Sequence, residues 1–238
     1  MDRLKREWML LVRPYDLPVR ISHWVMAASI SVLMITGYLI GDPPFSQPGD
    51  ATDLFLLGLI RYMHFVAAYF LTAAFILRLY WGFVGSEESR WSAFIPWGRK
   101  FWRHVFLEIY DLLWPRRPWH LYIGHFPIAK FAYVAVYLAV VFSIVSGFVM
   151  YASAQYSPMW RFVAEWGLKL FGDNLNWARQ LHHWLLWFFA VFVIIHVYLV
   201  VYTAARATTS AVASMIGGYK LLREEELAEG ELEEVGQR

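Results

Sequence analysis

The segment that decides the fold reads Arg179-Gln180-Leu181-His182-His183-Trp184 and continues through an apolar run to His196-Val197-Tyr198. It is long and apolar enough to cross the hydrocarbon core of a bilayer, which is about 30 Å thick. His182 and His196 are nearly four helical turns apart, so their side chains share one helix face roughly 21 Å apart. His183 points to a different face. Crossing a membrane does not require an imidazole near each surface, so we infer two stacked metal or cofactor sites.

The amino-acid composition is that of a membrane protein. Of the 238 residues, 59% are hydrophobic and 19% are aromatic, whereas soluble domains are about 45–50% apolar. The sequence contains no cysteine, which excludes disulfides, covalent CxxCH haem attachment and thiolate-held iron–sulfur clusters within this chain. A basic segment precedes the first apolar stretch without a small-residue cleavage site, so we expect a retained span and not a signal peptide.

Four long apolar segments predict four membrane-spanning helices. We place them approximately at residues 21–40, 62–84, 127–151 and 182–205. Apolar residues at helical spacing also predict short interfacial helices at 101–114 and 160–171. The predicted fold class is therefore an all-α integral membrane protein, a four-helix bundle with short interfacial helices in its loops. We expect residues 1–222 to form this membrane domain and residues 223–238 to form an acidic cytoplasmic tail.

The distribution of basic residues predicts the orientation of the chain. Segments 1–20, 85–126 and 206–238 together hold 15 Lys and Arg residues, whereas 41–61 and 152–181 together hold 4. Short loops rich in Lys and Arg stay on the cytoplasmic side. We therefore expect a multi-pass protein of the bacterial inner membrane with both termini in the cytoplasm.

Four histidines lie in or at the ends of the predicted spans, and their depths match in pairs. His23 opens the first span and His196 lies near the end of the fourth, both toward the cytoplasm. His64 opens the second span and His182 opens the fourth, both on the opposite side. Each level receives two imidazoles from different helices, which suits bis-histidine ligation of b-type haem in a bundle core. A single histidine at a helix end is usually an anchor, but matched pairs inside a membrane usually mark function.

An arginine stands three residues before three of these histidines. Residues at this spacing lie on the same face of a helix, and the guanidinium offers a fork that fits a carboxylate such as a haem propionate. The alternative is that interfacial arginines only extend their charged ends toward water and that the spacing is chance. We predict a propionate contact for at least one of Arg20, Arg61 and Arg179.

Glycine gives a weaker signal on the same faces. Gly37 follows His23 by fourteen residues, so it lies on that helix face at the level of His64 and His182. A glycine there would let a porphyrin edge approach the backbone, and Gly147 in the third span could do the same. The alternative is that small residues simply allow close packing of membrane helices.

The remaining histidines are less regular in position. His125, in Gly124-His125-Phe126-Pro127, stands at the cytoplasmic entrance to the third span, where it could assist proton uptake beside a quinone. The other three lie in loops or off the shared face, and we assign no ligand role to His104, His120 and His183.

Several short motifs follow one another in a fixed order up to about residue 222. They are Pro18-Val19-Arg20-Ile21-Ser22-His23-Trp24, Thr36-Gly37-Tyr38, Ile60-Arg61-Tyr62-Met63-His64-Phe65, Arg78-Leu79-Tyr80-Trp81, Gly124-His125-Phe126-Pro127-Ile128-Ala129, the spacing of His182 and His196, and Gly217-Gly218-Tyr219. In this order they resemble the cytochrome b subunit of membrane-bound [NiFe] uptake hydrogenases, a relative of the gamma subunit of formate dehydrogenase.

The resemblance implies a specific set of cofactors and partners. It implies four spans, haem b (two expected, one possible) and the ligands His23, His64, His182 and His196, in agreement with the pairing by depth. It also implies a periplasmic hydrogenase of large and small subunits, in which the small subunit presents an iron–sulfur cluster to this chain and packs a transmembrane helix against it. A higher oligomer of the complex is possible within this resemblance.

We therefore expect an electron-transfer subunit that passes electrons from hydrogen oxidation through haem b to quinone in a respiratory chain. The chain itself has no hydrogenase active site, since it lacks the cysteines that a nickel–iron site requires. The nearest alternative is a formate dehydrogenase-type gamma subunit or another quinone-linked di-haem cytochrome b. Alternatives of another class are a haem-free membrane anchor and a histidine proton relay. Against the relay, the spans lack the acidic residues that proton pathways commonly use.

Overall fold

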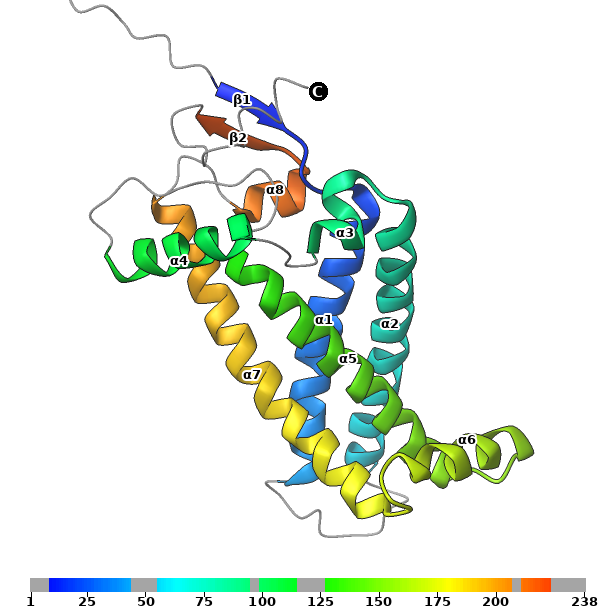
Figure 1. Ribbon diagram of the computed structural model, residues 1–238. Coiled ribbons are helices and arrows are strands. Elements are labelled where there is room, and N and C mark those ends of the chain that lie inside the picture. Colours follow the sequence, from blue (N-terminus) through cyan, green and yellow to red (C-terminus); the bar gives the residue numbers. More distant parts are fainter. Residues whose placement is uncertain (1–8, 44–54, 95–98, 115–126, 207–210, 224–238) are drawn as a thin grey trace, which may run out of the picture. The chain divides into compact units, whose positions relative to one another are not determined.

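A computed structural model describes residues 9–43, 55–94, 99–114, 127–206 and 211–223. The elements, shown in Figure 1, are β1 (Met9–Val12), α1 (Leu17–Gly41), α2 (Leu56–Val84), η1 (Glu87–Ser89), α3 (Trp91–Phe94), α4 (Arg99–Leu113), α5 (Pro127–Ser153), α6 (Pro158–Lys169), α7 (Leu175–Arg206), α8 (Ala211–Gly217) and β2 (Lys220–Arg223).

Four of these helices are long and apolar enough to cross a membrane, as the sequence predicts. Helices α1, α2, α5 and α7 contain 25, 29, 27 and 32 residues, and about 20 residues suffice for a span. The all-α membrane fold class is therefore confirmed. Each helix extends beyond its apolar stretch, because helix formation continues into polar flanking residues where the backbone can still close its hydrogen bonds. His64 and His182 consequently lie inside α2 and α7 and do not open them.

The start of α7 shows this most clearly. The side chain of Asn174 accepts hydrogen bonds from the backbone N–H groups of Asn176 (2.9 Å) and Trp177 (3.3 Å). Asparagine is among the best residues for capping a helix N-terminus in this way. The turn before it uses positive φ angles at Gly172 (62°) and Asp173 (57°). The helix therefore begins at Leu175, before the apolar run that sequence hydropathy detects.

The chain divides into two compact units, which we describe separately. The first unit comprises Met1–Ser22, Leu77–Val134 and Ile195–Arg238. The second unit comprises His23–Ile76 and Ala135–Ile194. Each of the four long helices contributes residues to both units.

In the second unit, four helix segments pack through aromatic pairs. Between α2 and α5 the ring centroids of Phe65 and Tyr151 are 5.2 Å apart, and those of Tyr69 and Phe148 are 5.7 Å apart. Between α1 and α7, Tyr38 and Trp187 meet edge to face. Offset and edge-to-face ring pairs stabilise packing beyond the area that they bury. Apolar or small side chains are deeply buried in this unit, among them Leu71, Phe75, Val140, Ser146, Val149, Ala152 and Ala178.

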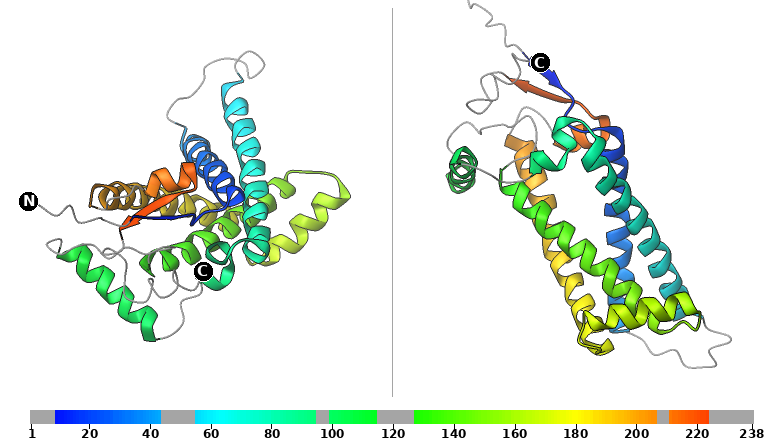
Figure 2. Two further views of the ribbon diagram at one scale, coloured as in Figure 1. Left: turned by 90° about the horizontal axis from the view of Figure 1, so that it is seen from above. Right: turned by 45° about the vertical axis from the view of Figure 1, so that its right-hand side comes forward.

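Helix α6 turns sideways from the end of α5, as Figure 2 shows. Gly167 permits this approach, because a Cβ at that position would lie only 2.2 Å from Cγ2 of Val149. Val149 also packs with Phe171 and Ala178 in a small apolar cluster. The cluster fixes the turn between α6 and α7 against α5, and thereby the start of the helix that carries His182.

In the first unit, two short strands join the two ends of the described chain. β1 and β2 are antiparallel, with Met9 opposite Arg223 and Val12 opposite Lys220. The sequence predicts no strand here, because four-residue strands are too short to show alternation and their pairing is long-range. The predicted boundary at residue 222 remains a prediction, and most of the predicted acidic tail lies outside the described residues.

Asp16 ties the start of α1 to the end of α2 within the first unit. Its Oδ2 accepts hydrogen bonds from Trp81 Nε1 (2.8 Å) and from the backbone N–H of Ser86 (2.9 Å). Burial raises the pKa of this carboxyl, but hydrogen bonds from Ser86, Trp81 and Ser89 outweigh it and hold the pKa below its usual value. Burial also raises the pKa of the neighbouring Tyr15 to about 12.

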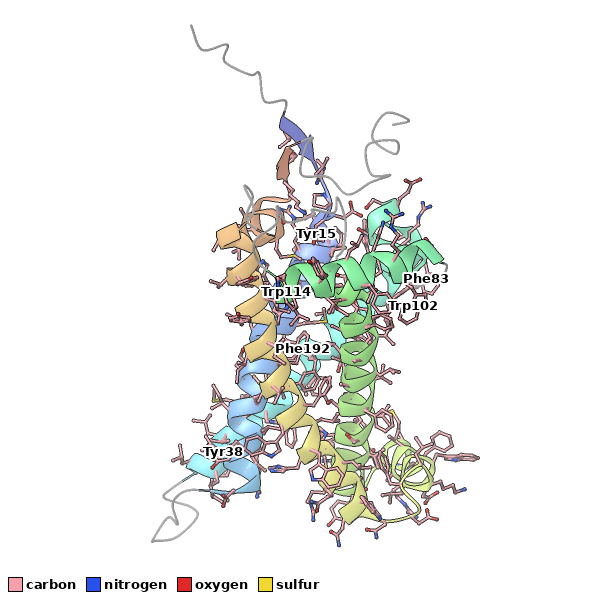
Figure 3. The ribbon with its side chains drawn as sticks, turned by 60° about the vertical axis from the view of Figure 1, so that its left-hand side comes forward. Tyr15, Tyr38, Phe83, Trp102, Trp114 and Phe192 are labelled. Carbon is pink, nitrogen blue, oxygen red and sulfur yellow. The ribbon has the colours of Figure 1, made fainter. Side chains whose placement is uncertain are left out.

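Helix α4 is attached to the start of α5, also in the first unit. Glu108 accepts a hydrogen bond from the backbone N–H of Ile128 (2.8 Å), which satisfies a donor in the first turn of α5 and places an anion at its positive end. The rings of Trp102 and Phe131 pack at 5.7 Å. Figure 3 shows Trp102 and Trp114 near the two ends of α4. Its exposed apolar side chains suit a helix that lies in the membrane interface: Trp102, Phe106, Ile109 and Leu113.

Candidate functional site

The structure brings His64 of α2 and His182 of α7 together. Their ring centroids are 6.3 Å apart and their planes cross at 63°. Both side chains are half-buried, and both belong to the second unit. The sequence-predicted pairing of these two histidines at one level therefore corresponds to a contact between two different helices.

A hydroxyl group contacts the Nδ1 atom of each imidazole. Thr36 Oγ1, on α1, lies 2.9 Å from Nδ1 of His64. Ser146 Oγ, on α5, lies 2.8 Å from Nδ1 of His182. All four long helices therefore contribute to this site, two through an imidazole and two through a hydroxyl.

Each hydroxyl residue is followed by a glycine that faces the same histidine. A Cβ built on Gly37 would lie 3.4 Å from Cε1 of His64, and one on Gly147 would lie 3.4 Å from Cε1 of His182. Gly37 thus lies at the predicted level. Its second neighbour is the side chain of Leu186 on α7. The nearest groups to both glycines are histidine rings, so these positions give an imidazole close access to the backbone.

Sequence reasoning missed Thr36 and Ser146. The detectable signal is a repeated dipeptide, Thr36-Gly37 in the first span and Ser146-Gly147 in the third. A hydroxyl residue in a membrane helix usually bonds its own backbone, so the dipeptide alone does not show that a histidine lies opposite.

The second predicted pair stays a prediction. His23 lies on α1 in the second unit, and its ring packs edge-on against Trp24 at 5.2 Å. His196 lies on α7 in the first unit, with an exposed side chain. The structure describes these two histidines in separate units.

The three predicted arginines occupy different surroundings. Arg20 donates a hydrogen bond from Nη1 to the backbone oxygen of Ile216, at the end of α8, and lies against Gly218. Arg61 is exposed on α2, one turn before His64. Arg179 is also exposed and donates from Nη1 to Asn176 Oδ1 at 3.1 Å. A propionate contact remains a prediction for all three.

The other histidines lie elsewhere or outside the described residues. His183 packs against α1, where a Cβ at Gly41 would lie 2.9 Å from its Cε1. His104 is on α4. The predicted quinone-site residue His125, and also His120, fall outside the described residues.

The described residues show paired imidazoles and no group of three His, Cys, Asp or Glu side chains that could hold a metal ion. Two imidazoles from facing membrane helices instead suit a metal whose other positions a planar macrocycle fills. The fold and the site thus define a class, a multi-pass helical membrane protein with a bis-histidine site.

The sequence comparisons identify the family. The family described as "Prokaryotic cytochrome b561" matches residues 14–218. The chain belongs to this family, which is one of b-type cytochromes.

Curated relatives agree with this assignment. The chain is 39% identical over 218 residues to the "Probable Ni/Fe-hydrogenase B-type cytochrome subunit" of Bradyrhizobium diazoefficiens, covering 88% of this chain and 86% of the relative. It is 38% identical to the protein of the same name from Cupriavidus necator, covering 88% and 87%. It is 36% identical to the "Probable Ni/Fe-hydrogenase 1 B-type cytochrome subunit" of Escherichia coli K12, covering 87% and 89%.

The family supports haem b as the cofactor, and the His64–His182 pair fits it. Two metal–imidazole bonds of about 2 Å each, together with the half-widths of two rings, separate the ring centres by on the order of 6 Å. The observed separation of 6.3 Å matches this requirement. The glycines beside both rings leave room at the backbone, and the donor set of two neutral imidazoles is that of a b-type haem.

Proposed function

We propose that this chain is the membrane cytochrome b subunit of a [NiFe] hydrogenase and that it delivers electrons from hydrogen oxidation to the quinone pool. The observation that carries the proposal is the His64–His182 pair, with its 6.3 Å ring separation inside a membrane helix bundle. The names of the relatives, each a hydrogenase B-type cytochrome subunit, support the hydrogenase as partner.

Four histidines are the proposed axial ligands. His64 and His182 would hold one haem b, and their spacing in the sequence makes His23 and His196 the candidates for a second. Haem b, when bound, supplies a one-electron carrier whose potential the axial ligands and their surroundings set. Arg20, Arg61 and Arg179 are the candidate partners of the propionates, because a guanidinium fits a carboxylate with two hydrogen bonds.

The direction of transfer follows from the charge distribution. The basic segments support a cytoplasmic position for both termini in the bacterial inner membrane. The ends of α2 and α7 that carry His64 and His182 then face the periplasm. Electrons enter there from the iron–sulfur cluster of the hydrogenase small subunit, whose transmembrane helix packs against this chain. Quinone is reduced near the cytoplasmic face, with His125 as a candidate proton donor.

A direct test uses membranes that contain the intact complex. Hydrogen gas should reduce a haem with b-type absorbance bands, whereas formate should not, and the hydrogenase subunits should co-purify with this chain. His64→Ala should abolish the hydrogen-driven absorbance change, while His104→Ala, on interfacial helix α4, should preserve it. Reduction by formate but not by hydrogen would instead assign a formate dehydrogenase-type partner. The absence of any haem absorbance would favour the anchor or the proton relay.

A further inference from the structure

The hydroxyl groups of Thr36 and Ser146 contact the two histidines in the same manner. Each lies within 2.9 Å of the Nδ1 atom of its histidine, although the two residues stand on different helices, α1 and α5. Neither hydroxyl is needed to span a membrane. The repeated arrangement therefore suggests a common task at the histidine pair.

A second contact decides which way these hydrogen bonds run. Thr36 Oγ1 lies 2.7 Å from the backbone oxygen of Val32, and Ser146 Oγ lies 2.6 Å from that of Phe142. A hydroxyl has one hydrogen to donate, and a carbonyl oxygen can only accept. The hydroxyl hydrogen therefore goes to the carbonyl, because two oxygens this close would otherwise repel each other.

The hydroxyl oxygen is then left as an acceptor for the imidazole. Nδ1 must carry the hydrogen in both contacts, so each histidine is held in the Nδ1–H tautomer. In a neutral imidazole the other nitrogen, Nε2, then bears the lone pair that can ligate a metal.

We propose that Thr36 and Ser146 are positioning residues that fix the tautomer and the ring orientation of His64 and His182, so that Nε2 of each ring is available to iron. This inference rests on the proposed haem ligation. Neither hydroxyl touches the iron, and each acts through its histidine. Outer-shell hydrogen bonds of this kind fix the ring and raise the basicity of a metal-ligating histidine.

The electronic consequence has a definite sign. A hydrogen bond from Nδ1–H to an acceptor makes the imidazole a stronger electron donor at Nε2. A stronger donor stabilises the oxidised iron more than the reduced iron. Loss of either hydroxyl should therefore shift the midpoint potential of this haem to a more positive value.

Two other hydroxyl residues of the membrane helices provide matched controls. Thr72 on α2 donates to the backbone oxygen of Ala68 (2.8 Å), and Ser153 on α5 donates to that of Val149 (2.8 Å). Like Thr36 and Ser146, each of these two residues donates its hydroxyl hydrogen to the backbone oxygen of the residue four positions earlier. Replacing them removes a hydroxyl from a membrane helix and leaves the two histidine contacts in place.

The first experiment is a redox titration of the haem absorbance band in the purified full chain. Thr36→Val and Ser146→Ala should each shift the midpoint potential positively and lower haem affinity by about 10–100-fold. Thr36→Ser, Thr72→Val and Ser153→Ala should match the wild type. An unchanged potential and haem content in Thr36→Val and Ser146→Ala would overturn the inference. A midpoint potential in Thr36→Ser that differs from the wild-type value would also overturn it.

A second experiment separates this inference from the proposed function. Nitrogen-15 NMR of labelled imidazoles in the full chain, produced without haem, should show His64 and His182 protonated at Nδ1. Thr36→Val should move the hydrogen of His64 to Nε2, and Thr72→Val should not. If the wild type shows this pattern yet never binds haem, the cytochrome proposal fails and the tautomer assignment stands. If haem binds but His64 is protonated at Nε2 in the haem-free wild type, the tautomer assignment fails alone.

Discussion

A Cβ added to Gly147 would lie 3.4 Å from Cε1 of His182, and the same distance separates a Cβ on Gly37 from Cε1 of His64. Each histidine ring thus lies against a glycine, His64 against Gly37 of α1 and His182 against Gly147 of α5. A methyl group at either position would meet the imidazole ring at the short limit of ordinary van der Waals contact, so the ring could come no closer to the backbone. Axial ligands tolerate little displacement because metal–nitrogen bonds have a narrow range of lengths.

Substitution of either glycine should therefore weaken haem binding. We expect Gly37→Ala and Gly147→Ala to lower haem affinity by about tenfold, within the range seen when support of a metal ligand is lost. Gly217→Ala is the control, because a Cβ at that position would meet nothing within 4 Å. Haem titration monitored by absorbance measures the effect. Wild-type affinity in both variants would mean that the rings move without consequence and that the glycines serve only helix packing.

Asp16 should make the stability of the protein depend on pH in the acidic range. Its pKa in the folded chain lies below the ordinary value of 3.8, so its contribution is complete above that value. The contribution is lost as the pH falls through the lowered pKa of the folded state. We expect Asp16→Asn to lower the free energy of unfolding by about 1 kcal/mol at neutral pH, since Asp16 is only half-buried.

Thermal unfolding in detergent at pH 7 and pH 3 checks this expectation. The difference between wild type and Asp16→Asn should be smaller at pH 3 than at pH 7. Asp42→Asn serves as the control, because the Asp42 side chain is exposed at the end of α1. A constant difference between wild type and Asp16→Asn at the two pH values would show that the charge of Asp16 does not contribute.

Gly218 should be needed for the link between α8 and β2. Its φ of 85° is one that side chains rarely adopt, and a Cβ there would lie 3.0 Å from Cζ of Arg20. Gly218→Ala should destabilise this region by about 1–2 kcal/mol. The expected fall in melting temperature is roughly 2–4 °C per kcal/mol for a chain of this size. Gly217→Ala should melt like the wild type, and equal melting of both variants would contradict the account.

The predicted orientation can be tested with reporter fusions. Alkaline phosphatase, which is active only outside the cytoplasm, should be inactive when fused after Trp114 and active when fused after Tyr156. A reporter at the C-terminus should be inactive. The opposite pattern would reverse the topology and move His64 and His182 to the cytoplasmic side.

The sequence predicted the number of membrane-spanning helices because the bilayer imposes a length and a polarity that four apolar runs satisfy. It predicted the level of His64 and His182 because the helical rise converts sequence spacing into depth. It placed their helix starts too late, because hydropathy detects the apolar part of a helix and not its capped polar end. Asn174 supplied that cap, and its N-cap role was overlooked.

The hydrogen-bonding partners could not be predicted in the same way. Whether Thr36 faces His64 depends on the rotation of α1 about its axis relative to α2. A hydroxyl residue in a membrane helix usually bonds its own backbone, so the sequence does not show which side chain lies opposite. The strand pair β1–β2 joins residues at opposite ends of the chain, and such long-range pairing leaves no local pattern. The hydrogen bond of Arg20 at the end of α8 is likewise long-range, and its contact with a propionate stays a prediction.

The ratio of haem to protein in the purified chain, determined by the pyridine haemochrome method, decides whether the histidines bind haem. We expect two haems in the wild type and one in each of His64→Ala and His196→Ala. One haem in the wild type, lost with His64→Ala and kept with His196→Ala, would confine ligation to the His64–His182 site. No haem in wild type produced with ample haem supply, or full haem content in His64→Ala, would contradict the account.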